Sequence, residues 1–374
     1  MYHGTPEGSA LFPLANNGYR GVNIFFGISG FLICSKLLSE KSLKRKISLK
    51  NFYTRRVFRI LPPAFFYVAV IALLGAVGVL ARMPRSEWLS SLFFFRNYLS
   101  PQLLSSYTGH FWSLSVEEHF YLIFPALLIL AGRRARFIIP ALALGFGIWR
   151  MLDMHYNLLN IQTIAPTQRT DRCADALLWA CALAIWIRDE RVKGFLERRL
   201  TFTVWLLLAG IYIFTWYHAP AMNGTIEGIL VPVLILGTVL NHRNPVARLF
   251  ELRGPVWIGR VSYSLYLWQT ILFAGRYYEP NVLQTFPLNA VVLLACACLS
   301  YYLLEKPMIA WGHKFSRPRE RRESLIPLAP PVRERFSQSF TLRSERSQVR
   351  SQPRVTKNQK QRSEIGNQRS ETGD

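Results

Sequence analysis

The chain carries little charge, since Asp, Glu, Lys and Arg make up only 18% of its 374 residues. Roughly 25% is usual for a soluble domain, so one large soluble core is disfavoured. The five cysteines form no CxxC pair and no cluster with histidine, so neither a metal site nor a disulfide framework is expected. The first residues also lack the apolar run of a secretory signal peptide.

Hydrophobic residues make up 51% of the chain, and they are gathered into long blocks separated by basic clusters. The blocks lie at about 22–39, 63–81, 117–131, 137–149, 176–187, 202–217, 226–240, 255–274 and 288–304. Several are shorter than the roughly 20 residues that span a bilayer, so their ends must extend into flanking residues. The pattern predicts an all-α fold, a polytopic transmembrane helical bundle of about nine spans. The segment 88–99 is short and polar in part, which favours an interfacial or re-entrant segment.

The net charge of +23 indicates which side of the membrane each loop faces. Lys and Arg are concentrated in the loops 40–59, 132–136, 188–199 and 241–254, and in the C-terminal tail. The positive-inside rule therefore places these segments and the C-terminus in the cytoplasm. No recognisable nucleic-acid fold carries the charge, so nucleic acid is not an expected partner. Anionic lipid at the bilayer surface is a simpler partner.

The chain divides into a membrane domain, residues 1–312, and a tail, residues 313–374. The tail is rich in Ser, Arg, Gln and Pro and has few aromatic residues, so we expect it to be disordered, basic and cytoplasmic. It either rests on anionic lipid or is simply solvated. Nine spans with a cytoplasmic C-terminus place the N-terminus outside, although nothing before residue 22 would carry it there. Either the N-terminal loop crosses unaided or a first helix is missing, and we favour the second explanation.

The segment HFWSLSVEEHFYLIFP, residues 110–125, places two carboxylates at the mouth of an apolar helix. Ser115 and Glu118 have the spacing of a capping box, in which Ser115 is the N-cap and Glu118 binds the backbone at the helix start. Glu117 has no such role and is therefore the better candidate for function. His110, before the helix, is either a proton carrier or a polar loop residue.

Three further segments carry polar groups at membrane boundaries. Arg55, Arg56 and Arg59 follow one another on a predicted short helix after residue 47; they either obey the positive-inside rule or clamp phosphates. The segment 167–175 contains Arg169, Asp171, Arg172 and Asp175, which form either a self-neutralising ion-pair cluster or a polar patch lining a substrate path. Tyr263 belongs to an unusually polar span, 258–269, where helix packing is the simpler explanation.

Six segments occur in the order of the motifs of a known family. They are GVNIFFGISGFLI (21–33), ISLKNFYTRRVFRILPP (47–63), HFWSLSVEEHFYLIFP, RTDRCADALLWACALA, VSYSLYLWQTILF (261–273) and LLEKPMI (303–309). Together they resemble the acyltransferase-3 family, membrane O-acyltransferases of the bacterial lipopolysaccharide and peptidoglycan O-acetylase type. The resemblance covers about residues 3–311 and implies a fold of ten helices.

The resemblance also implies a reaction, in which an acyl group, often acetyl, moves from cytoplasmic acyl-CoA to a hydroxyl of an extracytoplasmic glycan or lipid-linked sugar. His3 matches the histidine that ends the family's first helix, whereas the preceding family arginine has no counterpart in this sequence. By this analogy His3 is the base and Glu117 orients it, while Arg55, Arg56 and Arg59 hold the CoA phosphates.

His110, Arg169, Asp171, Arg172 and Tyr263 would then line the path of the acceptor or the acyl group. The resemblance also implies the bacterial inner membrane as the location. Two alternatives remain: a transporter or flippase, whose polar residues line a substrate path, and an inactive remnant without the first helix. No inverted repeat is visible, which counts against the transporter.

Overall fold

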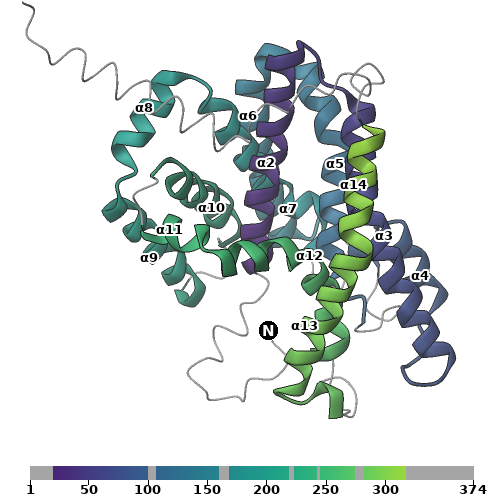
Figure 1. Ribbon diagram of the computed structural model, residues 1–374. Coiled ribbons are helices and arrows are strands. Elements are labelled where there is room, and N and C mark those ends of the chain that lie inside the picture. The colour runs from purple at the N-terminus through teal and green to yellow at the C-terminus, as the bar shows by residue number, and fades with distance from the viewer. Residues whose placement is uncertain are drawn as a thin grey trace, which may run out of the picture. The chain divides into compact units, whose positions relative to one another are not determined.

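The structure is a computed structural model that describes residues 20–99, 107–159, 168–218, 223–241, 245–273 and 282–316. All regular structure in these ranges is helical (Figure 1). The first helices are α2 (Arg20–Lys44), α3 (Leu49–Ala76), α4 (Arg85–Leu92), η1 (Arg96–Tyr98), α5 (Phe111–Ala131), η3 (Gly132–Arg134) and α6 (Ala135–Tyr156). Next come α7 (Thr170–Trp186), α8 (Glu190–Arg199), α9 (Phe202–His218), α10 (Asn223–Leu240), α11 (Pro245–Glu251), α12 (Arg253–Phe273), η6 (Val282–Gln284), α13 (Leu288–Ser300), the π-helical turn η7 (Tyr301–Glu305) and α14 (Lys306–Phe315). The predicted all-α class is confirmed for these residues.

Three helices are long and apolar enough to cross a membrane: Arg20–Lys44, Leu49–Ala76 and Leu288–Phe315. The third of these runs without a break through α13, η7 and α14. Two sharply bent pairs, α8 with α9 and α10 with α11, raise the number to as many as five if each pair forms one span. These numbers refer to the described ranges, and the nine spans of the sequence analysis stay a prediction.

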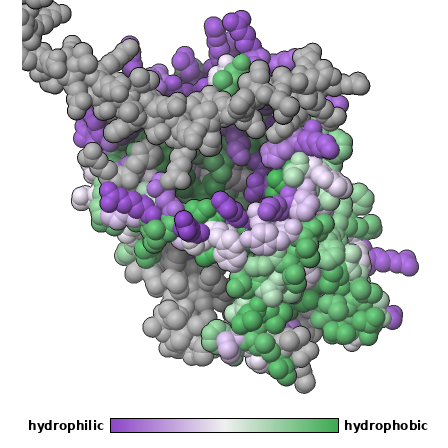
Figure 2. Space-filling model, in the orientation of Figure 1, coloured by the Kyte–Doolittle hydropathy of each residue, from purple (hydrophilic) through white to green (hydrophobic). Residues whose placement is uncertain are grey.

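Large apolar side chains remain exposed along the helices, as a lipid environment requires. Leu130 is 85% exposed and Leu303 is 73% exposed. Figure 2 shows hydrophobic residues over much of the lower part of the molecule, while hydrophilic residues gather toward the top of the view. A soluble monomer rarely exposes so large an apolar surface.

Helix α2 organises the bundle, because it packs against α7, α10 and α5. Its contact with α7 is close, because a Cβ added to Gly30 would clash with the carbonyl oxygen of Leu177. The Cys181 thiol donates to the Gly30 carbonyl at 3.3 Å. Small residues allow such close approach of helix backbones in membranes. The glycine therefore holds α2 in register with α7.

Replacing Gly30 by alanine is expected to lower the free energy of unfolding by about 1–3 kcal/mol, the usual cost of overpacking. The new methyl group would meet backbone, which cannot rotate away. Gly21→Ala on the same helix is the control, since no atom lies within 4 Å of its added Cβ. Thermal unfolding of both variants in the same detergent provides the measurement. Equal midpoints for the two variants would contradict the close contact.

Helix α3 corrects the expectation of a short helix after residue 47. Ser48 caps the helix by accepting from the Asn51 amide at 3.3 Å, and the helix then continues for 28 residues through Pro62 and Pro63. Prolines are tolerated in membrane helices where neighbouring groups satisfy the disturbed backbone. The hydroxyl of Tyr263, on α12, donates to the Ile60 carbonyl at 2.9 Å, next to the two prolines. The predicted phosphate-binding arginines are therefore fixed on a long, rigid helix.

The segment 88–99 forms the end of α4 and the short helix η1. Its Arg96 side chain is buried and donates to the Thr108 hydroxyl at 3.1 Å, and Thr108 in turn bonds to Glu87. These bonds attach the segment to the turn that precedes α5. They therefore help to position the start of the helix that carries Glu117.

Candidate functional site

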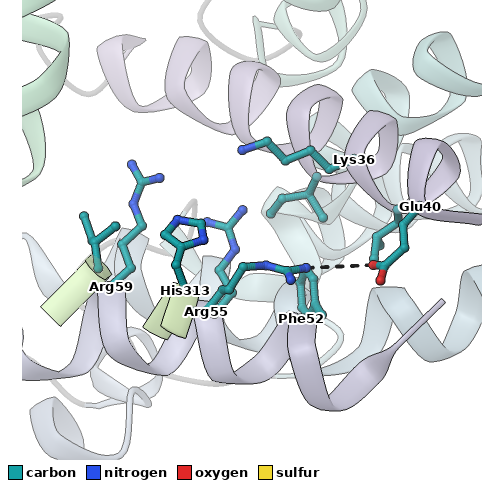
Figure 3. Close-up of a pocket in the computed structure, with 10 residues that line it drawn as sticks. Lys36, Glu40, Phe52, Arg55, Arg59 and His313 are labelled. Carbon is teal, nitrogen blue, oxygen red and sulfur yellow. Dashed lines mark ion pairs between the residues drawn. The ribbon is translucent and has the colours of Figure 1, made fainter. Parts of the chain in front are cut away.

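A cavity of about 110 Å³ lies between α2, α3 and α14 (Figure 3). Its lining consists of Ile33, Lys36, Leu37, Glu40, Phe52, Arg55, Arg56, Arg59, Ile309 and His313. Figure 3 shows Lys36 from α2 and two arginines from α3 pointing into the same space. Cations outnumber the one carboxylate of the lining, so the cavity suits an anionic ligand.

The three arginines predicted to bind phosphates, Arg55, Arg56 and Arg59, all line this cavity. Lys36 of α2 and His313 of α14, which were not predicted from the sequence, also line it. Lys36 did leave a signal, because it is a lone cation inside the apolar block 22–39. No sequence pattern indicated His313, since only the packing of α14 against α3 brings it to the cavity.

Glu40 neutralises only part of this charge. Its carboxylate lies 3.8 Å from the Arg55 guanidinium and 3.0 Å from the Lys44 ammonium. Arg56 and Arg59 have no ion-pair partner among the residues that the structure describes. Two guanidinium groups are therefore left for a ligand, in a geometry that favours phosphate or carboxylate groups.

Arg56 connects the cavity with α5. Its Cζ atom lies 4.7 Å from the ring centroid of Tyr121, which is one helical turn after Glu117. Both Arg56 and Arg59 are close enough to attract the Glu117 carboxylate electrostatically. Arg56 thus links the basic cavity with the surroundings of the carboxylate singled out by the sequence.

Glu117 is buried among the side chains of α2 and α5, with 3% of its surface exposed. The hydroxyls of Ser29 and Tyr121 lie beside the carboxylate, but its Oε1 atom has no hydrogen-bond partner. A buried carboxylate without full partners is costly, so its presence indicates a functional role.

The capping box predicted for this helix is wrong. Helix α5 begins at Phe111, and Ser115 lies inside it, where its hydroxyl donates to the Phe111 carbonyl at 2.9 Å. The helix starts one turn earlier because the preceding turn supplies acceptors: the Phe111 amide donates to the Thr108 carbonyl at 2.9 Å. Glu118 therefore has no capping role. Its Oε1 is also buried and unpartnered, so greater burial is what distinguishes Glu117.

His110 is buried just before α5. Its Nδ1 shares a 2.6 Å hydrogen bond with the Thr270 hydroxyl, and its ring is surrounded by the rings of Tyr67, Phe111 and Tyr266. Its Nε2 has no hydrogen-bond partner. The residue is therefore held rigidly rather than lying on an open loop, and its place on a substrate path stays a prediction.

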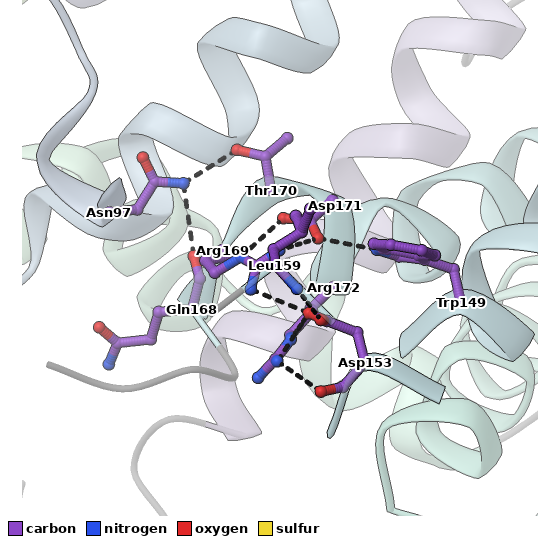
Figure 4. Close-up of polar contacts among 9 residues, drawn as sticks. All are labelled: Asn97, Trp149, Asp153, Leu159, Gln168, Arg169, Thr170, Asp171 and Arg172. Atoms are coloured by element: carbon purple, nitrogen blue, oxygen red, sulfur yellow. Dashed lines mark hydrogen bonds and ion pairs between the residues drawn. The ribbon is translucent and has the colours of Figure 1, made fainter. Parts of the chain in front are cut away.

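The charged residues at the start of α7 form ion pairs, some of them across helices, as Figure 4 shows. Arg172 and Arg169 both reach Asp153 of α6, at 2.6 and 2.9 Å. The Arg169 contact is within ion-pair distance but lacks hydrogen-bond geometry at Nη1. Arg169 also pairs with Asp171 at 2.6 Å. The arrangement supports a structural role for these charges, and a role on the acyl path stays a prediction.

Arg172 and Asp175 do not pair with each other; each pairs with a residue of α6. Asp175 accepts from Arg150 at 2.6 Å, and Arg150 also donates to the Thr225 hydroxyl at 2.6 Å. Asp153 and Arg150 were not predicted from the sequence, because each is a single charge in a mostly apolar segment and its partner lies on another helix.

Asp175→Asn is expected to lower the free energy of unfolding by about 3 kcal/mol, because it leaves the buried Arg150 without a counter-charge. Asp189→Asn is the matched control: this exposed aspartate caps α8 through the Arg191 amide, and asparagine caps equally well. Chemical unfolding in one detergent compares the two. A change below about 1 kcal/mol for Asp175→Asn would show that the pair contributes little.

His3 lies outside the described residues, as do residues 317–374 of the predicted tail. Tyr263 is partly buried, and its hydroxyl is occupied by the bond to the backbone of α3. Among the residues with described structure, no group of three His, Cys, Asp or Glu side chains could hold a metal ion.

The apolar helices are those of an integral membrane protein, and the charge of its basic cavity suits an anionic ligand. The family model described as acyltransferase domain (Acyl_transf_3) matches residues 1–305, so the chain belongs to this family of acyltransferases. This match confirms the resemblance seen in the motifs.

Three relatives specify the similarity. The chain is 26% identical to the peptidoglycan O-acetyltransferase OatA of Listeria monocytogenes, over 79% of this chain and 52% of that protein. It is 27% identical to the O-acetyltransferase OatA of Staphylococcus aureus, over 80% of this chain and 54% of that protein. It is 30% identical to the putative peptidoglycan O-acetyltransferase YrhL of Bacillus subtilis, over 82% of this chain and 53% of that protein. The chain thus spans about half the length of these curated relatives. No solved structure matches it.

Proposed function

We propose that this protein is an integral membrane O-acyltransferase of the bacterial inner membrane. It would transfer an acyl group from acyl-CoA to a hydroxyl of an extracytoplasmic glycan or lipid-linked sugar. The names of the relatives favour acetyl as the acyl group and peptidoglycan as the acceptor class. The observation that carries the proposal is the basic cavity, whose Arg56 also lies over the ring of Tyr121, one helical turn from the buried Glu117.

The cavity is the proposed donor site. Arg56 and Arg59 lack ion-pair partners among the described residues, and Lys36 adds a third cation from α2. Guanidinium groups bind phosphates through paired charge-assisted hydrogen bonds, and CoA carries several phosphates. The positive-inside rule assigns the loop between α2 and α3 to the cytoplasm, which is where CoA occurs. The donor would therefore enter from the cytoplasmic side.

The acceptor would be activated near Glu117. O-acylation requires a base for the hydroxyl proton and positive groups or donors for the oxyanion. We assign the base to His3 and the orienting carboxylate to Glu117, by analogy with other carboxylate–imidazole pairs. His110, Arg169, Asp171, Arg172 and Tyr263 are proposed to border the path of the acceptor or the acyl group. The C-terminal tail would remain on the cytoplasmic side.

The test is a comparison of cells with and without the gene. Surface glycan is extracted from both, and its ester-linked acetate is released with mild alkali and measured. In a second experiment the purified full chain is titrated with acetyl-CoA. We expect the deletion to remove the ester and the protein to bind acetyl-CoA. An unchanged ester content together with impaired export of a lipid-linked precursor would favour a transporter instead.

A further inference from the structure

The face of α2 that lines the donor cavity continues to Ser29. Ile33, Lys36 and Glu40 line the cavity, and they follow Ser29 by 4, 7 and 11 residues. This spacing keeps all four on one side of a helix. At 1.5 Å per residue, Ser29 lies roughly 10 Å beyond Lys36 along the helix axis. Ser29 therefore lies on the cavity face, farther into the middle part of α2.

Buried serines of this bundle form hydrogen bonds in two ways. The Ser115 hydroxyl donates to the Phe111 carbonyl of its own helix, whereas the Ser113 hydroxyl shares a 2.5 Å hydrogen bond with the hydroxyl of Tyr266, on α12. Ser29 is bonded in the second way: it is buried, and its Oγ shares a 2.7 Å hydrogen bond with the hydroxyl of Tyr121, which lies on α5. The Glu117 carboxylate lies beside both hydroxyls.

A buried hydroxyl beside a carboxylate is the arrangement that activates a nucleophile. Glu117 retains an oxygen without a hydrogen-bond partner, so it has free capacity to accept a proton. The same hydroxyl lies on the cavity face of α2, and the Arg56 guanidinium covers the ring of Tyr121. An acyl thioester whose phosphates occupy the basic cavity could therefore extend toward Ser29.

We propose that Ser29 is an acyl-accepting nucleophile, so that the acyl group is carried on its Oγ between the donor and the acceptor. This proposal rests on the proposed function. In the first step the Ser29 oxygen attacks the thioester carbonyl while Glu117 accepts its proton. The C–S bond then breaks, and the CoA thiolate takes up the proton from Glu117 and leaves as the free thiol.

In the second step the acceptor hydroxyl attacks the Ser29 ester. The proton of that hydroxyl passes through the base to the Ser29 oxygen as the ester bond breaks, which regenerates the serine. No other reactant is required. A covalent carrier within the membrane would explain how the acyl group passes between two aqueous sides while CoA stays on one of them.

The experiment uses the purified full chain with radiolabelled acetyl-CoA and no glycan acceptor. The reaction is quenched with acid, and the labelled peptide is identified by mass spectrometry. We expect one acetyl group on Ser29 in the unmodified protein and in Tyr121→Phe, and none in Ser29→Ala. In Ser29→Cys the label should become a thioester, which neutral hydroxylamine removes. Glycan acylation by Ser29→Ala should fall at least about 100-fold while acetyl-CoA binding persists.

The proposal is overturned if the protein binds acetyl-CoA and acylates glycan but carries no acetyl group at Ser29, or carries it at Tyr121. Either result leaves the proposed function intact. The proposed function fails separately if the unmodified protein does not bind acetyl-CoA and deletion of the gene leaves the glycan esters unchanged. Peptide mapping of the unmodified protein decides the question even if Ser29→Ala does not fold.

Discussion

Glu117→Gln is expected to lower the ester-linked acyl content of the surface glycan at least about 100-fold, the lower end of what a positioned acid–base group contributes. Glutamine preserves the shape of the buried side chain but cannot accept a proton or balance a positive charge. Binding of acetyl-CoA should stay within about threefold, because the cations of the cavity are unchanged. Alkaline release of acetate and calorimetric titration with acetyl-CoA measure the two quantities.

Glu118→Gln is the matched control, because Glu118 is adjacent in sequence and its Oε1 is also buried and unpartnered. We expect this variant to retain more than about a tenth of the acylation, since Glu118 is less buried than Glu117. Full acylation by Glu117→Gln would reject the role of Glu117. An equal loss in both variants would show that the two carboxylates act as a unit.

Arg56→Gln is expected to weaken acetyl-CoA binding about 10- to 100-fold. One charge-assisted hydrogen bond contributes about 1.5–3 kcal/mol, and 1.4 kcal/mol corresponds to a tenfold change. Glutamine retains part of the side-chain stem that packs near Phe52 and Tyr121. Titration at two salt concentrations provides a second readout, because loss of a phosphate contact should also reduce the salt dependence.

Lys50→Ala is the control for charge alone. Lys50 is exposed on the same helix but does not line the cavity. Its removal should change the affinity less than about twofold. An equal loss of affinity in both variants would indicate that the net positive charge of the region, and not the cavity, attracts the donor.

The sequence predicted the all-helical class and several members of the site. Long apolar blocks leave the backbone few options other than helices, because lipid cannot satisfy free amide and carbonyl groups. The spacing of Arg55, Arg56 and Arg59 placed them together on one helix, where neighbours stay close wherever that helix packs. Their assignment to the CoA phosphates came from the family resemblance. The family also followed from the sequence, because the six segments occur in the order of the family's motifs.

Other features depended on which helices meet. The capping box around Ser115 was wrong because an earlier turn satisfies the first amides of α5, and such long-range support leaves no local pattern. The pairing of Arg172 with Asp153 depends on α6 lying against α7. Sequence spacing predicts ion pairs within one helix, whereas a buried charge pairs with the opposite charge that lies on the helix packed against it.

The sequence by itself therefore determined the helical membrane class, the family and the cluster of arginines, all of which rest on local spacing and composition. Only the tertiary structure decided that Lys36 and His313 complete the cavity and that Ser29 of α2 lies beside Glu117 and Tyr121 of α5. These groups come from helices far apart in the chain. A contact between such helices depends on close packing, as at Gly30, and no periodic pattern along the sequence records it.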